Sequence, residues 1–300
     1  MTHQHVRTAV FPVAGMGTRF LPATKSIPKE MLPLVDRPLI QYAIDEAREA
    51  GIEEFIFVTA RGKSALEDYF DASPMLERKL HEDNKLDLLA EVENSTMPSG
   101  AIAYIRQQEA LGLGHAVWCA RRLIGNQPFA VILPDDVIAG EIGCLKQMVD
   151  AYNAAGGKGC MVAAMEVPHD RTSSYGVIDP SEDHGQLVSA KGLVEKPKPE
   201  VAPSNLAVIG RYVLSPKVMT ALGEMKQGAG GEIQLTDAIA DQITAGDPVY
   251  GFRFDGKRFD CGSKSGYLQA TVDFALEGDD LRDEFMSFLQ TIASTRLAAE

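Results

Sequence analysis

The sequence predicts an α/β fold with a mixed, mainly parallel central sheet flanked by helices. The first observation is that apolar strand-like runs alternate with helical patterns before residue 159, which is typical of parallel βαβ units. The second is a change after Gly159, where strand-like runs follow one another through short or irregular links and predict a mixed sheet. With 300 residues, of which 45% are hydrophobic, the chain is long enough for a large core.

In the first half we expect strands and helices to alternate. Residues 38–50 illustrate a helix, because their apolar side chains recur at helical spacing, Pro38 suits the first turn and Gly51 suits the end. The predicted strands are 8–13, 54–59, 101–106 and 129–133. The predicted helices are 38–50, a charged stretch from about Lys63, one or two exposed amphipathic helices over 74–93, then 114–123 and 141–154.

The second half is richer in strands. We expect strands at 160–167, 175–178, 187–195, 206–214 and 249–254. The predicted helices are 232–244, 264–276 and 281–289. No linker divides the chain, so we expect a single domain over residues 1–300, made of the stretches 6–158, 159–262 and 263–300.

Composition and charge exclude several classes of protein. The chain has 29 basic and 42 acidic residues, a formal net charge of −13, which argues against nucleic acid as a partner but not against a small anionic substrate. No apolar run reaches the ~18–20 residues that span a bilayer, and the N-terminus lacks a signal-peptide pattern. We therefore expect a cytoplasmic protein without a membrane partner. Its cysteines, having no C-x-x-C pair, indicate buried thiols, and His115 is given no catalytic role.

The stretch from residue 13 to residue 33 leaves an apolar strand and carries the most information. It holds two glycines, several basic side chains and three prolines without a helical period, which predicts a loop that wraps a polyphosphate. A Walker loop and a dinucleotide fingerprint both fail, because each requires glycine where Phe20 stands. A Gly-x-Gly pair alone would equally indicate a tight turn. The basic residues Arg19, Lys25 and Lys29 favour phosphate binding.

Other polar groups also follow strand ends, where ligands bind in open α/β sheets. Gln107 and Gly112 follow one predicted strand, and Asp135 and Asp136 follow another. Either aspartate suits Mg²⁺, which takes one or two carboxylates with phosphate oxygens and water, although an isolated Asp-Asp pair is more typical of a turn or a helix N-cap. Asp260 is a second candidate ligand.

Lys196 and Glu195 have two interpretations. An exposed neighbouring pair is commonly a solvated ion pair of little energetic weight. In a binding site, the lysine would neutralise a phosphate and the glutamate would accept hydrogen bonds from sugar hydroxyls.

Several motifs in a fixed order carry a family resemblance. They are V-A-G-M-G-T-R at 13–19, K-S-I-P-K-E-M-L-P at 25–33, R-Q-Q-E-A-L-G-L-G-H-A at 106–116, L-P-D-D at 133–136, S-Y-G-V-I at 174–178, V-E-K-P at 194–197, G-E-I-Q-L-T-D at 231–237 and F-D-C-G at 259–262. The chain resembles the sugar-1-phosphate nucleotidylyltransferases over roughly residues 6–290. The charged insert at 74–93 points to their uridylyl-transferring branch. The resemblance implies a Rossmann-like fold of the nucleotide-diphospho-sugar transferase type.

The resemblance also implies a reaction and its residues. With Mg²⁺ bound, the phosphate of glucose 1-phosphate would attack the α-phosphorus of UTP by in-line displacement. The products would be UDP-glucose and pyrophosphate. The implied catalytic residues are Arg19, Lys29 and Lys196. The implied nucleotide-binding residues are Ala14, Gly15, Gly17, Thr18, Gln107, Gly112 and Asp135. Gly176, Glu195, Lys196 and Asn205 would bind the sugar phosphate, and Asp135 and Asp260 the metal.

Two other functions stay open at this point. A thymidylyl-transferring relative differs by one methyl group on the base, which a pocket discriminates by only ~1–3 kcal/mol. The other alternative is a nucleotide-sugar sensor without catalytic activity. The presence of all the charged residues implied for catalysis argues against this alternative. The resemblance further implies a homodimer or a homotetramer, in which the helices of 74–93 and 281–289 are candidate contacts.

Overall fold

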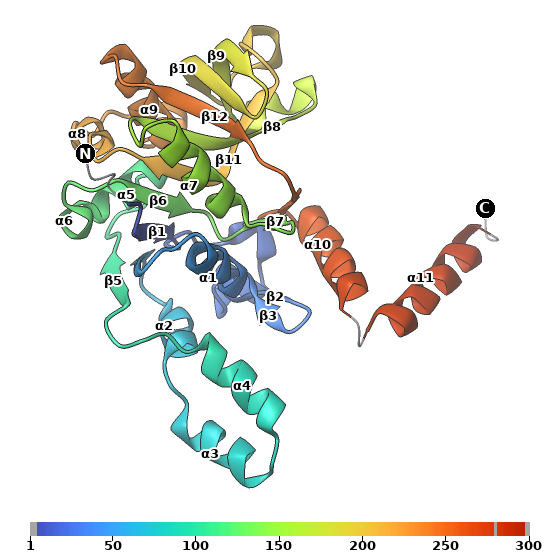
Figure 1. The fold of residues 1–300 in the computed structure, drawn as a ribbon. Coiled ribbons are helices and arrows are strands. Elements are labelled where there is room, and N and C mark those ends of the chain that lie inside the picture. The colour runs from blue at the N-terminus through green and yellow to red at the C-terminus, as the bar shows by residue number, and fades with distance from the viewer. Residues whose placement is uncertain (1–4, 279–280, 298–300) are drawn as a thin grey trace.

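The computed structural model describes residues 5–278 and 281–297, and its centre is a nine-stranded sheet (Figure 1). Strands β5, β4, β1 and β6 pair in parallel, as do β8 and β12, whereas β11 and β10 run antiparallel to the strands beside them. The predicted mixed, mainly parallel sheet is confirmed. In spatial order the strands are β5 (Ile102–Arg106), β4 (Glu54–Thr59), β1 (Thr8–Pro12), β6 (Phe129–Ile132), β11 (Leu206–Leu214), β8 (Cys160–Glu166), β12 (Val249–Arg253), β10 (Leu187–Glu195) and β9 (Gly176–His184).

Helices cover both faces of this sheet because its central strands are apolar on both sides. In β1, Phe11 packs on one face and Val10 on the other, since successive strand residues point to opposite faces. One face is covered by α1 (Leu39–Glu49), α2 (Ser64–Phe70) and α7 (Cys144–Ala154). The other is covered by α5 (Leu113–Cys119), α6 (Arg121–Ile124), α8 (Val218–Gly223) and α9 (Leu235–Thr244).

The long basic loop contains three short 3₁₀ turns and no α-helix, as its prolines predict. The turns are η1 (Thr18–Phe20), η2 (Ala23–Lys25) and η3 (Lys29–Met31). Two small strand pairs, which the sequence did not predict as pairs, flank the loop. They are β2 (Pro33–Leu34) with β3 (Arg37–Pro38), and β7 (Asp136–Ala139) with β13 (Lys257–Asp260). The second pair aligns Asp136 with Asp260 and so joins the two predicted carboxylate sites.

Some predicted boundaries differ from those observed, each for a local reason. The helix expected from residue 232 begins at Leu235, because Ile233 is held extended by hydrogen bonds to Leu111 and Gly114. The strand expected at 175–178 continues to His184 as a hairpin with β10, closed by Gly185 at φ +83°. The last helix, α11 (Arg282–Leu297), is longer than expected.

Two helical projections leave the body of the molecule (Figure 1). The arm of α3 (Pro74–Glu82) and α4 (Leu86–Ser95) confirms the predicted exposed amphipathic helices, and Arg48 ties its end to α1 by donating to the carbonyl oxygens of Asn94 and Thr96. On another side, α10 (Lys264–Glu277) continues into α11. In the described part of the chain, no helix is long and apolar enough to cross a membrane.

A buried ion pair crosses the interior beneath the strand ends. Arg211 on β11 is 1% exposed and donates from Nε and Nη2 to the carboxylate of Glu46 on α1. Its Nη1 donates to the carbonyl of Leu133 at 3.0 Å, and Glu46 also accepts from the backbone N–H of Leu145 at the start of α7 at 2.8 Å. One pair therefore connects α1, α7, β11 and the end of β6.

We expect Arg211→Met to lower the free energy of unfolding by about 3–5 kcal/mol, because it leaves the Glu46 carboxylate buried without its cation. Urea unfolding followed by circular dichroism measures the loss. The exposed pair between Arg7 and Glu53 supplies the control, and Arg7→Met should leave the stability nearly unchanged. Equal losses in the two variants would contradict this account.

Candidate active site

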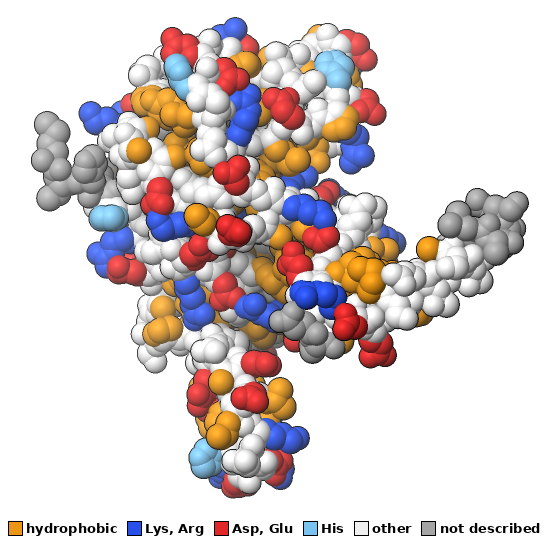
Figure 2. Space-filling model, turned by 45° about the vertical axis from the view of Figure 1, so that its right-hand side comes forward, with side chains coloured by type: hydrophobic (Ala, Val, Ile, Leu, Met, Phe, Trp, Pro, Cys, Tyr) orange, Lys and Arg blue, Asp and Glu red, His pale blue; other side chains and the backbone are white. Residues whose placement is uncertain are grey.

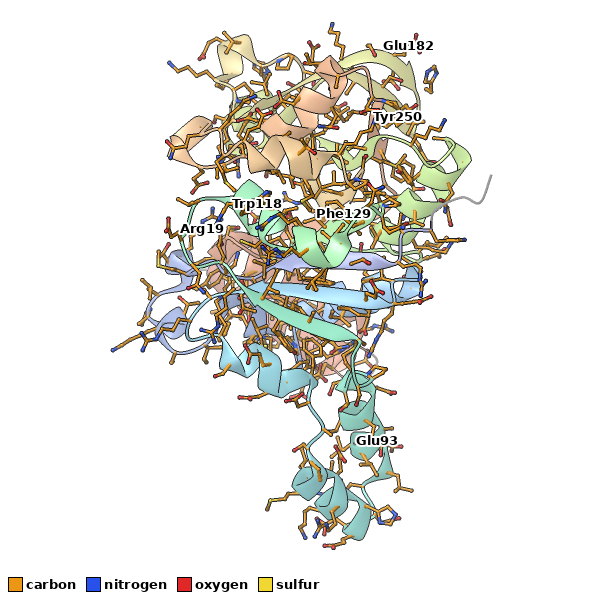
Figure 3. The ribbon with its side chains drawn as sticks, turned by 90° about the vertical axis from the view of Figure 1, so that its left-hand side faces the viewer. Arg19, Glu93, Trp118, Phe129, Glu182 and Tyr250 are labelled. Atoms are coloured by element: carbon orange, nitrogen blue, oxygen red, sulfur yellow. The ribbon has the colours of Figure 1, made fainter. Side chains whose placement is uncertain are left out.

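A cavity of about 480 Å³ lies beyond the strand ends and is lined by both halves of the chain. From the first half it receives Arg19, Asp135 and Asp136, and from the second half Glu195 and Lys196. Gly176 and Asp260 also border it. The structure thus brings together most of the charged residues that the sequence placed at strand ends, as the rule for open α/β sheets predicts. In Figure 3, Arg19 is labelled at the left of the view, below Trp118.

The basic loop meets the sheet through an ion pair between Lys29 and Asp135, whose Nζ and Oδ2 atoms are 2.6 Å apart. Burial alone would raise the pKa of Asp135, but the ammonium group of Lys29 and the charge of Arg19 lower it below its ordinary value. Burial likewise opposes the charge on Lys29, yet Asp135 and Glu30 raise the pKa of Lys29. Both groups are therefore charged at neutral pH.

Asp136 has a different environment from its neighbour. Its Oδ1 accepts from Nε of Arg258 at 2.6 Å, and its Oδ2 accepts from the backbone N–H of Gly210 at 3.1 Å. Burial raises the pKa of Asp136, and the nearby charge of Asp135 adds to this, although Arg258 opposes it. Both oxygens of Asp136 are thus engaged by the protein, which leaves Asp135 as the carboxylate better suited to a ligand.

Asp135 and Asp260 converge over the backbone of Gly262. A Cβ atom on Gly262 would lie 2.8 Å from Oδ2 of Asp135 and 3.1 Å from Oδ1 of Asp260. It would also lie 3.3 Å from Nη1 of Arg19, which donates to the Gly262 carbonyl. The absence of a side chain here therefore lets two carboxylates and a guanidinium approach one point. Two converging carboxylates fit a divalent cation that takes its other ligands from a substrate and water.

The glycines of the basic loop keep its turn compact. Gly17 has φ +65°, and a Cβ there would lie 3.1 Å from Cβ of Lys29. The hydroxyl of Thr24 donates to the Gly17 carbonyl at 2.7 Å. A larger residue at Gly17 would displace Lys29 from Asp135. Ala14, Gly15 and Thr18 lie on the same loop, and Gly15 and Thr18 are exposed.

On the opposite wall, Glu195 is held in place by two neighbours. Its Oε2 accepts from the hydroxyl of Thr236 at 2.7 Å, and its Oε1 lies 3.2 Å from Nζ of Lys196. A Cβ on the buried Gly176 would lie 3.2 Å from the same Oε2 atom. Lys196 has φ +48° at the end of β10, and its exposed side chain borders the cavity. Both residues of the pair therefore line the cavity, Glu195 held by Thr236 and Lys196 exposed.

Several predicted residues lie outside this lining: Ala14, Gly15, Gly17, Thr18 and Lys29 of the basic loop, and Gln107, Gly112 and Asn205. Gln107 and Gly112 contact each other through a 3.1 Å hydrogen bond from Nε2 to the Gly112 carbonyl, next to Leu113, which does border the cavity. Asn205 is exposed and contacts His169, with Oδ1 and Nδ1 2.8 Å apart.

The charged side chains of the lining balance one another. The cations are Arg19, Arg171, Lys196 and Arg258, and the anions are Asp135, Asp136, Glu195 and Asp260. The local balance is less acidic than that of the chain as a whole, which has a formal net charge of −13. Among the residues described, no three His, Cys, Asp or Glu side chains are grouped to hold a metal alone. A cation that binds together with a polyanionic substrate would make the net charge of the cavity positive.

The sequence did not single out four residues that build the site. Arg258 holds Asp136 and donates to the hydroxyl of Tyr175 at 3.1 Å, Thr236 holds Glu195, and Gly262 provides space. Three of these lie in motifs that carry the family resemblance, at 174–178, 231–237 and 259–262. Their presence in these motifs, with no structural role evident from the sequence, was the observation that could have identified them as site residues.

Known proteins are similar in sequence to this chain over most of its length. The family model described as nucleotidyl transferase matches residues 9–276. A UTP–glucose-1-phosphate uridylyltransferase of Bacillus subtilis (strain 168) is 49% identical over 285 residues, which cover 95% of this chain and 96% of that protein.

Solved structures agree with the sequence relatives. The structure of UTP-bound UGPase from Acinetobacter baumannii has a TM-score of 0.86 at 43% identity and covers 95% of this chain and 99% of that one. A UDP-glucose pyrophosphorylase complexed with UDP-glucose has a TM-score of 0.81 at 44% identity and covers 91% of this chain and 100% of that one.

Proposed function

The chain belongs to the nucleotidyl transferase family, and we propose that it is a UTP–glucose-1-phosphate uridylyltransferase. It transfers uridylyl from UTP to α-D-glucose 1-phosphate and releases pyrophosphate. The observation that carries this proposal is the cavity that Arg19 of the basic loop and three aspartates line together with Glu195 and Lys196. Such a cavity suits two polyanionic substrates that enter from opposite walls.

The reaction is an in-line displacement at phosphorus. An oxygen of the sugar phosphate forms a bond to the α-phosphorus of UTP while the bond to pyrophosphate breaks. Positioning and electrostatic stabilisation supply most of the catalysis in such transfers, so no protein nucleophile is needed. Lys196 holds the attacking phosphate, and Arg19 and Lys29 hold the triphosphate and the leaving pyrophosphate.

The metal that the family implies fits this site. We assign Mg²⁺ to Asp135 and Asp260, because their oxygens converge over Gly262 and Asp136 is already engaged. When bound, the ion neutralises charge on the phosphoryl oxygens. Lys29 is then no longer the principal cation facing Asp135, and its ammonium group becomes available to a phosphate.

We propose the remaining contacts from the family resemblance. The stretch 6–158 binds the nucleotide, with Gln107 and Gly112 at the base and Ala14, Gly15, Gly17 and Thr18 providing backbone close to it. The stretch 159–262 binds the sugar phosphate through Gly176, Glu195, Lys196 and Asn205. The stretch 263–300 supplies the C-terminal helices, of which residues 279–280 and 298–300 lie outside the described part of the chain.

We also propose a homodimer or homotetramer that acts in the cytoplasm. The helices α10 and α11 carry exposed apolar side chains at Leu268, Met286, Phe288 and Ile292. Figure 2 shows hydrophobic side chains gathered around this projection. Such faces on projecting helices are typical of subunit contacts. The four cysteines are free, as expected in a reducing compartment.

We expect Mg²⁺-dependent release of pyrophosphate from UTP and glucose 1-phosphate, with kcat/KM for UTP about tenfold or more above that for dTTP. A coupled pyrophosphate assay over several sugar 1-phosphates, with and without EDTA, measures this. A clear preference for dTTP would assign the chain to the thymidylyl branch. Tight UDP-glucose binding without pyrophosphate release would support a sensor instead.

Lys196→Ala should raise KM for glucose 1-phosphate and lower kcat, because it removes a charge-assisted contact to the sugar phosphate. We expect a fall in kcat/KM of about tenfold to a hundredfold. Lys198→Ala, two residues further along and outside the cavity lining, is the matched control. Unchanged kcat/KM in Lys196→Ala would remove this lysine from the site.

Gly262→Ala should lower kcat by about ten- to a hundredfold, because the added methyl group forces apart the two carboxylates that bind the metal. The control is Gly192→Ala, where a Cβ would make only an ordinary 3.5 Å contact with Asp179. Steady-state rates at several Mg²⁺ concentrations distinguish weaker metal binding from a slower chemical step. Equal activity in both variants would refute the convergence argument.

A further inference from the structure

His115 lies in the first turn of α5, and its two ring nitrogens face different partners. Nδ1 is 3.1 Å from Nε2 of Gln107, and Nε2 is 4.0 Å from Sγ of Cys119. The same Nε2 atom of Gln107 donates to the carbonyl of Gly112 at 3.1 Å. The Gln107 amide nitrogen is therefore placed between two groups, a carbonyl oxygen and an imidazole nitrogen.

These contacts admit one consistent arrangement of protons. The Gly112 carbonyl only accepts hydrogen bonds, so the amide nitrogen of Gln107 must face it and not the amide oxygen. Its second N–H then points to Nδ1 of His115, which must carry a lone pair. The imidazole is thus neutral with its proton on Nε2, directed at the sulfur of Cys119. Burial raises the pKa of Cys119, so this sulfur belongs to a thiol at neutral pH.

The surroundings keep this arrangement rigid. The ring of His115 stacks on Trp118 with the centroids 6.0 Å apart, and the guanidinium of Arg121 lies 3.4 Å above the Trp118 ring. Figure 3 labels Trp118 on the same side of the molecule as Arg19. Gly112 has φ +101°, and a Cβ there would lie 2.7 Å from Cβ of Glu232. The carbonyl that Gln107 contacts therefore has little freedom to move.

We propose that His115 is a positioning residue that selects the nucleotide base through Gln107. With both amide N–H groups occupied, Gln107 presents only Oε1, a hydrogen-bond acceptor. A pyrimidine with an N–H at ring position 3, such as uracil, satisfies this acceptor. Cytosine presents a lone pair at that position, and two acceptors would face each other. The inference rests on the proposed function, in which Gln107 faces the base.

Two substitutions of His115 distinguish its role in positioning Gln107 from its role in packing against Trp118. His115→Phe keeps a flat ring for Trp118 but removes the acceptor, which frees the Gln107 amide to turn and present its N–H groups. His115→Asn loses the ring but places an amide oxygen near the position of Nδ1. We expect His115→Phe to raise KM for UTP about three- to tenfold with kcat within about twofold, and to narrow the preference for UTP over CTP about tenfold. His115→Asn should stay within about threefold of the parent on both measures.

A double-mutant cycle tests whether the effect passes through Gln107. In a Gln107→Ala background, His115→Phe should have little further effect on the ratio of kcat/KM for UTP and CTP. His184→Phe, at an exposed histidine on β9, is the control for general effects of the substitution. Equal impairment of His115→Phe and His115→Asn, or an unchanged UTP-to-CTP ratio in His115→Phe, would overturn the proposal.

The tautomer of His115 can be measured on the parent protein, so this test does not depend on the folding of a variant. ¹⁵N-histidine NMR distinguishes the two neutral tautomers, and His115 should carry its proton on Nε2. A proton on Nδ1 would overturn the arrangement. If the parent protein makes no UDP-glucose from UTP, the proposed function fails. If it does and the His115 variants behave alike, only the present inference fails.

Discussion

The buried ion pair between Arg211 and Glu46 fixes the turn on which the rest of the site depends. Arg211 donates to the carbonyl of Leu133, the residue that follows β6 and precedes the aspartate turn. The neighbouring Gly210 reinforces this, because its carbonyl accepts from the N–H of Leu133 at 2.8 Å and its N–H donates to Asp136. A central strand of the second half thus sets the backbone that carries the carboxylates of the first half. Burying two charges is costly in water-free surroundings, and here the pair is satisfied by backbone groups from several elements.

The same turn explains why two adjacent aspartates differ. Asp136 points back into the protein, where Arg258 and Gly210 occupy its oxygens and burial raises its pKa. Asp135 points to the basic loop, where Lys29 lowers its pKa. Asp135 lies in the turn that follows β6 whereas Asp136 begins β7, so the two side chains leave the backbone in different local conformations. The two aspartates are chemically identical, so the direction of each side chain decides which of them can contact a bound group.

The sequence predicted the parts of this site that depend on short-range pattern. The apolar run before Gly15 and the run before Asp135 were recognisable as strands, and the rule for parallel sheets then placed both loops at one edge. It could not pair Asp136 with Arg258, which is 122 residues away, because no periodicity signals that contact. The strands β7 and β13 are four residues long and half-polar, too short for an alternation pattern to be distinctive. Arg211 lies in an otherwise apolar strand, where a charge indicates a buried partner but does not identify Glu46.

Charge balance in the cavity bears on how a protein with a net charge of −13 receives two polyanions. Lys29, Arg258 and Lys196 are each paired with a carboxylate of the site, so these three cations do not form an unopposed cluster. The pair with Lys29 lowers the pKa of Asp135 and holds this lysine in place before a substrate enters. Lys29 is paired with Asp135 in the structure, so an incoming phosphate would compete with that carboxylate for the ammonium group. In the proposed function, a metal ion held by Asp135 would release Lys29 to the nucleotide, and the ion pair would then couple the two binding events.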